Sequence, residues 1–456
     1  MYLIYLAFIR MHTTPNHELP SFSGYLRKVF HFRKTVASLR DGRQDPDISP
    51  QTVFLALFHG FVFRLSSFLQ LQADLAQPHL QHYTEAPRAF GDDVLRYSLA
   101  GFALAPLEQM LVNINRRLKR NKALDPGRVQ GRVVAALDGI EVLSSFSRCC
   151  EFCLQRRVVS QDQQGQPIEQ IQYYHRLVGC QVVSSPVKPI LALEWVRPGE
   201  GEDTAALRLL RRLPELYGSR FFDILLLDSL YAQTPVLQLA KEIAWDLVIT
   251  LKQENRTLYQ DAQGLWQGRA PDDQLTEKHG NNVVEAQLWQ AEDLPFTEEH
   301  PQPMRVVRSE ERKTEWHYRK GKRVSETKFE KWVWITTLEA KTFSIRQVRQ
   351  LGHDRWRLEN NAWCDLTKHW ALKHGFLHAC KHRPQCRDAE GQLQPLPNHG
   401  LQAVTLILCI AFILCSAFAR LHSKLFRRYR LSMLEVSRQL YRSLWKLQPP
   451  IRAPDG

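Results

Sequence analysis

Three acidic residues in this sequence stand where a carboxylate is costly unless it has a partner. Asp138 ends the apolar run RVVAALD, Asp228 ends FFDILLLD, and Glu359 lies among cations and aromatic residues in RWRLENNAW. A buried carboxylate costs free energy unless it caps a helix, forms an ion pair or binds a cation. Hard divalent cations such as Mg²⁺ bind several carboxylate oxygens together with phosphate oxygens of a substrate. The three acids therefore suggest metal-assisted chemistry on a phosphodiester.

Each aspartate also has a simpler explanation when it is taken alone. Asp138 precedes Gly139, and Asp-Gly is a common pair in hairpin turns. Asp228 precedes SLYA, where its side chain would cap the start of a helix. For either residue alone, the turn or the cap is the commoner explanation.

Glu359 favours a metal-binding catalytic site over the turn and the helix cap as the explanation of these acids. On a single helix over 353–373, four side chains would lie within roughly 40° of Glu359, namely Arg355, Trp363, Trp370 and Lys373. Cations and aromatic rings around a carboxylate suit a site beside a phosphate backbone better than they suit an apolar core.

The apolar patterns around these acids predict an α/β sheet. Strands are predicted at 132–143, 171–183, 189–197, 221–232 and 246–252. Amphipathic helices at 203–217 and 234–245 alternate with the last of these strands, as in a sheet with crossover helices. Residues 253–334 are polar with short alternating stretches, which predict several short antiparallel strands. A further helix is predicted over 341–378.

The flanking regions are predicted to be helical. Residues 50–73 and 92–118 have the apolar spacing of helices, and a basic segment follows at 116–128. DNA phosphate contacts are predicted there, although a solvated helix end explains the charges equally well; the residues are Arg116, Arg117, Lys119 and Arg120. The uncharged run 403–419 is at the short limit for a membrane span, but we expect a buried core helix and no membrane partner.

The composition limits the class of partner. The chain has 61 Lys and Arg against 47 Asp and Glu, a net charge of +14, which favours a polyanion, nucleic acid before an anionic membrane. A hydrophobic content of 44% excludes a disordered chain. The nine cysteines form no evenly spaced framework, and MYLIYLAFIR lacks a basic start and a cleavage site. We therefore expect reduced thiols and a cytoplasmic protein.

In order and context, the three acids resemble those of DDE-type insertion-sequence transposases, which have an RNase H-like core. Asp138 in AALDGIEVLSS stands where the family's first Asp ends the first strand. Asp228 in ILLLDSLYA matches the second Asp, after the fourth strand, and Glu359 matches the acid on the last catalytic helix. The long interval between Asp228 and Glu359 is similar to that of the subgroup with a β-rich insertion, the hairpin-forming cut-and-paste transposases.

The resemblance covers roughly 130–425 and implies a domain order. It implies an α/β, RNase H-like mixed sheet whose two parts are separated by a β-rich insertion, with a helical N-terminal domain before them and a basic tail after them. The implied ranges are 1–130 (helical domain, DNA binding), 131–252 (core, first part), 253–334 (insertion), 335–425 (core, second part) and 426–456 (tail).

The resemblance also implies an activity. A transposase of this kind binds the terminal inverted repeats of its own element, and Asp138, Asp228 and Glu359 would hold two Mg²⁺ ions, replaceable by Mn²⁺, for strand cleavage and strand transfer. Since two element ends must be paired, a homodimer on double-stranded DNA is expected, in a prokaryotic cytoplasm at the nucleoid. A catalytically inactive DNA-binding derivative and an RNase H-like nuclease are the alternatives.

The subgroup's Tyr-Arg-Glu-Lys signature is matched only in part. Arg355 stands at the Arg position, whereas Gly352 and Leu366 stand at the Tyr and Lys positions. Substitutes for the missing lysine are sought in Lys368 and Lys373, which with Arg355 are predicted DNA contacts. Trp356 resembles a family aromatic on which a flipped base would stack, and packing on the sheet is the other explanation.

A second cluster suggests zinc. Cys150-x-x-Cys153 and His175 are potential Zn²⁺ ligands, and a structural site needs a fourth, for which Cys149 and Cys180 are candidates. Small buried cysteines without metal are common, so that alternative stays open. A weaker metal candidate is the run His369, His374, His378 and His382 with Cys380 and Cys386.

Overall fold

The computed structural model describes residues 17–161, 165–252, 254, 256–319, 322–374, 377–378, 385–387, 392–395 and 398–446. These residues form a mixed α/β protein with N-terminal helices and one large mixed sheet, which confirms the predicted class. The chain divides into two compact units. We call them the helical unit (Met1–Ala123, Glu141–His175 and Cys364–Gly456) and the sheet unit (Leu124–Ile140 and Arg176–Trp363).

The helical unit combines segments from both halves of the sequence. Its helices are α2 (Glu18–Phe30), α3 (Phe32–Val36), α4 (Pro50–Phe63), α5 (Phe68–Leu75), α6 (Pro78–Thr84), α7 (Asp92–Ala100), α8 (Leu104–Arg120), α13 (Cys364–His369), α14 (Gly400–Ala417), the π-helix η4 (Phe418–His422), α15 (Lys424–Arg428) and α16 (Met433–Lys446). It also contains β2 (Leu154–Gln161), β11 (Gln385–Arg387) and β12 (Leu393–Pro395).

Helix α14 contains most of the long uncharged run and lies in the core of this unit. It packs against α4, α7, α8 and α16, and its residues from Ala403 onward are buried. Together with η4 it is long and apolar enough to cross a membrane, and the bent pair α4–α5 passes the same test, yet 89% of the most apolar stretch of α14 and η4 is covered by the protein. These contacts agree with the predicted core helix.

Part of the segment 426–456, which we expected to be a basic tail, is the helix α16 (Met433–Lys446). Helix α16 packs on α2 and α4 and buries Val436, Leu440 and Leu444. Its Tyr441 donates a hydrogen bond to Asp74, 2.9 Å away. The arginines of this segment therefore alternate with an apolar stripe at helical spacing.

The sheet unit contains most of the strands. They are β1 (Val134–Ser145), β3 (Pro167–Val182), β4 (Ile190–Trp195), β5 (Ile224–Leu227), β6 (Asp246–Thr250), β7 (Asp273–His279), β8 (Asn282–Pro295), β9 (Pro303–Arg319) and β10 (Lys322–Thr336), and β1 and β3 extend beyond the unit. Their order is β3–β1–β5–β6–β10–β9–β8–β7, with β4 also paired to β3. The 3₁₀ helix η1 (Asp125–Gly127) precedes β1.

Parallel pairing builds the centre of this sheet. β5 is parallel to β1 and β6 is parallel to β5. Helix α9 (Glu202–Tyr217) packs on β4 and on α10 (Thr234–Ile243), which also covers β6. These strands and helices agree with the predicted crossover pattern. β2, which pairs with the part of β3 in the helical unit, was not predicted because LQRRVVSQ is mostly exposed and carries two arginines.

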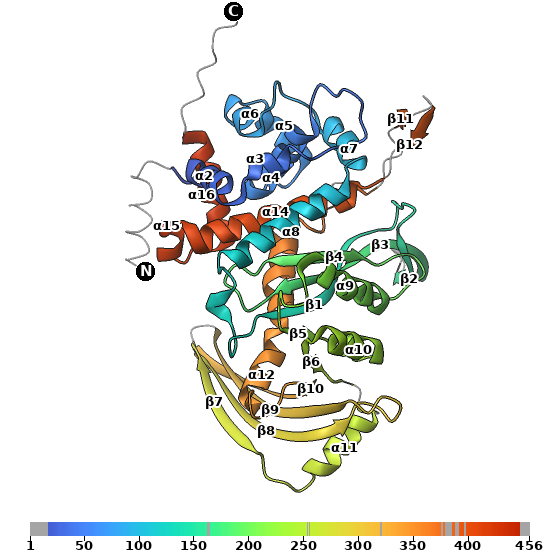
Figure 1. The fold of residues 1–456 in the computed structure, drawn as a ribbon, viewed down its shortest axis with the longest axis vertical. Coiled ribbons are helices and arrows are strands. Elements are labelled where there is room, and N and C mark those ends of the chain that lie inside the picture. The colour runs from blue at the N-terminus through green and yellow to red at the C-terminus, as the bar shows by residue number, and fades with distance from the viewer. Residues whose placement is uncertain are drawn as a thin grey trace, which may run out of the picture. The chain divides into compact units, whose positions relative to one another are not determined.

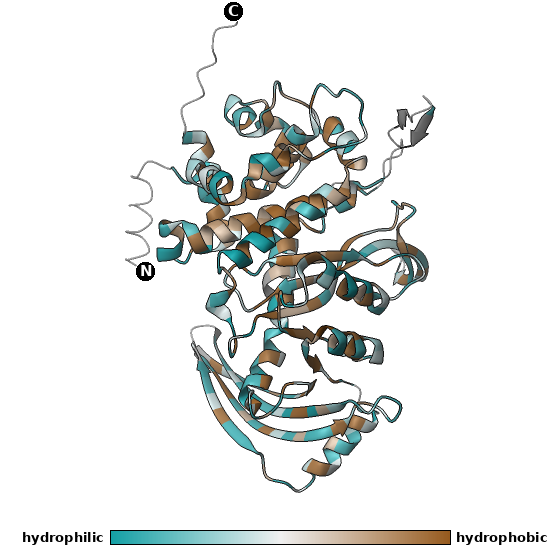
Figure 2. Ribbon diagram, in the orientation of Figure 1, coloured by the Kyte–Doolittle hydropathy of each residue, from teal (hydrophilic) through white to brown (hydrophobic). Residues whose placement is uncertain are grey.

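The 253–334 segment forms four antiparallel strands, β7 to β10, which Figure 1 shows as one curved layer. They are longer than the short strands predicted, since β9 has 17 residues. Hydrophobic and hydrophilic residues alternate along them (Figure 2), as expected when only one face is covered. Helix α11 (Thr257–Trp266) packs on β8, and α12 (Ile345–Asp354) packs on β6, β8, β9 and β10.

The segment 341–378 contains helices, as predicted, but the single unbroken helix assumed over 353–373 is wrong. Helix α12 begins with a capping box at Ser344 and ends at Asp354, and the π-helix η3 (Leu358–Trp363) and α13 follow it. The change of helix type alters the angular spacing of side chains, so the face calculated for an unbroken α-helix does not exist. Asn360 and Asn361, which are poor helix formers, lie in the π-helical segment.

Candidate active site

Asp138 and Asp228 lie at matching positions of neighbouring parallel strands. Ala136 of β1 is paired with Leu226 of β5, and Asp138 and Asp228 follow these residues by the same number of positions. Because adjacent strands are about 4.8 Å apart, the backbones of Asp138 and Asp228 lie next to each other at the same edge of the sheet. This edge belongs wholly to the sheet unit.

Asp138 is not part of a turn, since β1 continues to Ser145. The pKa of Asp138 is raised to about 6, chiefly by burial; the Arg355 guanidinium acts to lower it, and the charges of Glu359 and Glu202 act to raise it. Nη1 of Arg355 lies 3.8 Å from Oδ2 of Asp138. Burial is the largest cause of this raised pKa, and the carboxylates of Glu359 and Glu202 add a smaller effect.

Asp228 occupies the N-cap position of the 3₁₀ helix η2 (Ser229–Tyr231), but its side chain makes no capping hydrogen bond. Its Oδ1 lies 3.2 Å from Nζ of Lys252. The capping explanation is therefore not met, and the acid holds a cation instead. Lys252 is half-exposed, so its ammonium is a partner that a metal ion could replace.

Glu359 lies on η3 with an exposed side chain. Its charge acts on Asp138, which brings the third predicted acid into the same electrostatic environment as the first. A π-helical segment at this point is notable, because π-turns within helices are frequent at functional sites.

Glu202, the first residue of α9, is a fourth acid that the sequence did not reveal. Its carboxylate accepts a hydrogen bond of 2.6 Å from the Tyr231 hydroxyl and forms an ion pair with Arg176. A Cβ atom at Gly139 would clash with this carboxylate, which explains a glycine after Asp138. In the sequence, an acid at a helix start indicates only a favourable interaction with the helix dipole.

The chemistry of these side chains fits a hard divalent cation. Carboxylate oxygens are the protein ligands that Mg²⁺ and Mn²⁺ prefer. Among the described residues, the group that brings three or more donor atoms within 4.8 Å of one another is a Cys and His cluster rather than these acids. The acids do not form such a compact group among the described residues, so a substrate would have to supply some of the ligands of a cation bound there.

Arg355 has a different contact from the DNA phosphate that we predicted. Its side chain is 4% exposed and lies beside Asp138, with the guanidinium 4.4 Å from the ring centre of Trp356. Trp356 is half-buried, and its ring centre is 6.3 Å from that of Trp332 on β10. This contact agrees with the explanation that Trp356 packs on the sheet.

The departures from the Tyr-Arg-Glu-Lys signature have physical reasons. A Cβ atom at Gly352 would clash with the buried indole of Trp334, so a tyrosine does not fit there. Leu366 is fully buried in α13. The proposed substitutes Lys368 and Lys373 are exposed in the helical unit, whereas Arg355 belongs to the sheet unit.

The aromatic residues expected to face DNA with Glu359 are core residues. Trp363 packs on β3, where a Cβ atom at Gly179 would lie 2.6 Å from its ring. Trp370 is buried, and its ring centre is 5.5 Å from that of Phe412. Of the basic residues on the last turns of α8, Arg116 and Arg120 are exposed, and Arg117 and Lys119 are half-buried.

The zinc candidates come together in the helical unit, but with a different fourth residue. The Sγ atoms of Cys150 and Cys153 and the Nε2 atoms of His175 and His378 lie within 4.8 Å of one another. Neither Cys149, which is exposed, nor Cys180, which is buried in the sheet unit, belongs to the cluster. Of the weaker run, His378 alone joins it among the described residues; His369 and His374 are exposed, and Cys380 and His382 lie outside the described residues.

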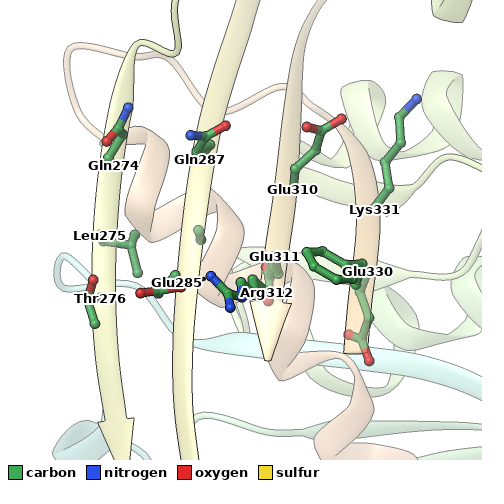
Figure 3. A pocket seen from close by; sticks show the side chains of 12 residues that line it. Gln274, Leu275, Thr276, Glu285, Gln287, Glu310, Glu311, Arg312, Glu330 and Lys331 are labelled. Atoms are coloured by element: carbon green, nitrogen blue, oxygen red, sulfur yellow. Dashed lines mark ion pairs between the residues drawn. The ribbon is translucent and has the colours of Figure 1, made fainter. Parts of the chain in front are cut away.

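A separate hollow of about 770 Å³ lies on the face of β7 to β10 (Figure 3). Its charged lining side chains are Glu285, Glu310, Glu311, Glu330, Arg312 and Lys331. Arg312 pairs with Glu285 at 3.6 Å. With more carboxylates than cations, this hollow is unsuited to a phosphate backbone, and it contains none of the predicted catalytic acids.

Comparisons with known proteins leave the family open. No family model matches the chain, and no curated protein matches its sequence. Among solved structures, the chain is similar to a piggyBac transposase in a synaptic complex with hairpin DNA, determined by cryo-EM, at 10% identity and a TM-score of 0.37. The match covers 96% of this chain and 79% of the transposase chain. At this TM-score the similarity supports no conclusion about the site or its chemistry.

Proposed function

We propose that this chain is a DDE-type DNA transposase whose catalytic residues are Asp138, Asp228 and Glu359. The observation that carries the proposal is the register of β1 and β5, which sets the two aspartates side by side at one sheet edge. The charge of Glu359 acts on Asp138, and the net charge of +14 favours a polyanionic substrate.

In this proposal the acids hold two Mg²⁺ ions, which Mn²⁺ can replace. Such ions activate the attacking oxygen and stabilise the leaving oxygen of an in-line phosphoryl displacement. Arg355 offsets part of the negative charge around Asp138, and Lys252 holds Asp228 before a metal ion binds. Glu202, oriented by Tyr231 and Arg176, adds charge that favours cations at the site.

The substrate of the proposed enzyme is the pair of terminal inverted repeats of its own element, followed by target DNA. Pairing two ends requires two copies of the chain, so we propose a homodimer on DNA. The protein would act at the nucleoid in a prokaryotic cytoplasm. The helical N-terminal residues 1–130 and the insertion 253–334 are the candidate regions for reading the repeats.

Excision of a marker in cells tests the proposal. The marker is placed between the DNA ends that flank this gene, and wild type is compared with Glu359→Gln and Asp138→Asn. Glu339→Gln is the matched control, because Glu339 is an exposed acid paired with Lys341 outside the site. We expect excision by wild type and control, and none by the two site variants, while all four bind the ends.

Two alternatives have distinct outcomes in the same experiment. Binding of the ends by every protein without excision would identify an inactive DNA-binding derivative. Metal-dependent cleavage of any duplex, with no requirement for the element ends, would identify an RNase H-like nuclease.

A further inference from the structure

We propose that Cys150, Cys153, His175 and His378 bind one Zn²⁺ ion as a closed structural site in the helical unit. Three separate segments supply the ligands: the turn before β2, the strand β3 and the segment 377–378. The inference concerns different residues and a different metal from the proposed transposase chemistry, and it stands independently of that chemistry.

Three distances within the cluster match a tetrahedral zinc site, and one, from His378 to Cys153, is shorter. Zinc lies about 2.3 Å from sulfur and about 2.0–2.1 Å from nitrogen, so tetrahedral ligand atoms are roughly 3.3–3.8 Å apart. The Sγ atoms of Cys150 and Cys153 are 3.6 Å apart, and they lie 3.3 and 3.4 Å from Nε2 of His175. Nε2 of His378 is 3.0 Å from Sγ of Cys153. The sulfur atoms are much farther apart than in a disulfide.

Both imidazoles use the same ring nitrogen, Nε2, towards the sulfurs. The two rings are nearly perpendicular, at 86°, with centres 5.2 Å apart, so they approach the cluster from different directions. Cys153, His175 and His378 are each at least 94% buried.

The ligand types select the metal and its role. Two thiolates and two imidazoles suit Zn²⁺, whereas Mg²⁺ prefers the oxygen ligands of the acidic site. Four protein ligands leave no open position for a substrate, which is typical of a structural zinc site. Residues 377–378 form a bend, and a metal bound by His378 would join this segment to β3.

Metal content of the full-length protein, purified without chelator, is the first test. We expect one zinc per chain in wild type, and loss to background in Cys153→Ser and His378→Ala. The matched controls are Cys149→Ser, a neighbouring exposed cysteine outside the cluster, and His374→Ala, an exposed histidine near His378; both should retain the metal. Zinc retained by Cys153→Ser, or lost from the two controls, would overturn the assignment.

A second measurement on wild type covers the case in which ligand variants fail to fold. Replacement of zinc by Co²⁺ should give the intense visible absorption of tetrahedral cobalt and sulfur-to-cobalt charge-transfer bands. A strong chelator should lower the melting temperature of wild type, and added zinc should restore it. Wild-type protein that contains no zinc and takes up neither Zn²⁺ nor Co²⁺ at one equivalent would refute the proposal, whatever the outcome of the excision experiment.

Discussion

A Cβ atom at Gly139 would overlap the carboxylate of Glu202, so the glycine and this side chain approach closely. Because Gly139 follows Asp138 in β1, this contact places a fourth acid beside the first predicted catalytic acid. Gly139 therefore allows the Glu202 carboxylate to lie close to β1, and it does not form the hairpin turn that the Asp-Gly pair suggested. The contact gives the first prediction.

Gly139→Ala should displace the Glu202 carboxylate, because the end of a flexible side chain moves more readily than the backbone of a strand. Removing this negative charge from the surroundings of Asp138 should weaken Mn²⁺ binding at the acidic site by several-fold, with a small loss of stability. Titration calorimetry with Mn²⁺ measures the first effect. Gly24→Ala, in α2 where no atom lies within 4 Å of the new methyl group, is the control. Unchanged Mn²⁺ affinity in Gly139→Ala would contradict this account.

Tyr231→Phe should destabilise the sheet unit. The Tyr231 hydroxyl is buried, and burial followed by the charge of Glu202 raises its pKa, so it donates to Glu202 as a neutral phenol. Loss of a hydrogen bond to a largely buried carboxylate costs about 1–3 kcal/mol. Urea unfolding measures the cost, and a double-mutant cycle with Glu202→Gln should show coupling between the two residues. Additive effects would mean that the hydrogen bond does not form in solution. Tyr429→Phe, at an exposed tyrosine, is the control.

The ionisation of Glu311 should make the unfolding free energy depend on pH in the acidic range. Burial opposes ionisation of Glu311, but hydrogen bonds from His353 and Arg349 outweigh burial and lower its pKa to about 2. The unfolded value is about 4.3, so the ionised carboxylate contributes about 3 kcal/mol above that pH. This contribution should be lost as the pH falls from about 4.3 to 2, because protonation of Glu311 removes its interactions with Arg349 and His353.

Glu311→Gln should therefore flatten the pH dependence of the unfolding free energy between pH 4.3 and 2. At pH 7 it should cost about 3–5 kcal/mol, because Arg349 is left buried without its main partner. Glu277→Gln is the control, since Glu277 also pairs with Arg349 but is more exposed. If the unfolding free energy of Glu311→Gln fell as steeply between pH 4.3 and 2 as that of wild type, Glu311 would not be the source of this pH dependence.

Gly352→Ala tests why the signature tyrosine is absent. A methyl group at 352 would overlap the indole of Trp334, which is 1% exposed and has no free space to enter. Overpacking of this kind costs about 1–3 kcal/mol. Guanidinium unfolding measures the loss, and Trp334→Leu in the same chain should make Gly352→Ala less costly. An equal cost in both backgrounds would show that Trp334 is not the cause.

The sequence predicted the elements that carry continuous apolar runs, and these include the strands before Asp138 and Asp228. It did not predict Glu202, because nothing local links the start of α9 to Gly139, which lies far away along the chain. His378 was recognised as a metal candidate with the wrong partners, since ligand spacing within one segment carries no information about a second segment. His378 joins Cys150, Cys153 and His175 in one cluster only because the fold brings the two segments together.

Local sequence was also insufficient to predict which side chains around Glu359 are buried. Its aromatic residues and cations were placed on one face by assuming an unbroken α-helix, and the π-helical turn at Leu358–Trp363 removes that face. Trp363 and Trp370 are then needed to fill cores, a requirement that depends on neighbours such as Gly179 and Phe412. The positions of Trp363 and Trp370 therefore depend on tertiary packing, which the local sequence pattern does not contain.

DNA binding by the basic end of α8 can be separated from binding near α13 by its salt dependence. Each phosphate contact that is lost should reduce the slope of log K against log salt by about 1. We expect a reduction of about 2 for Arg116→Ala with Arg120→Ala if both residues contact phosphate. The same measurement on Lys368→Ala with Lys373→Ala tests the substitutes for the missing signature lysine. Arg88→Ala is the control, because Arg88 is an exposed arginine that pairs with Asp47.

The two double variants discriminate between surfaces because both pairs of residues are exposed and lie on different segments. A reduced slope for the α8 pair alone would assign phosphate contact to the helical N-terminal region and leave the lysine position of the signature without a substitute. A reduced slope for the Lys368 and Lys373 pair alone would assign phosphate contact to the segment that follows Glu359. Slopes equal to that of Arg88→Ala and of wild type in both cases would make the basic end of α8 an ordinary solvated helix end.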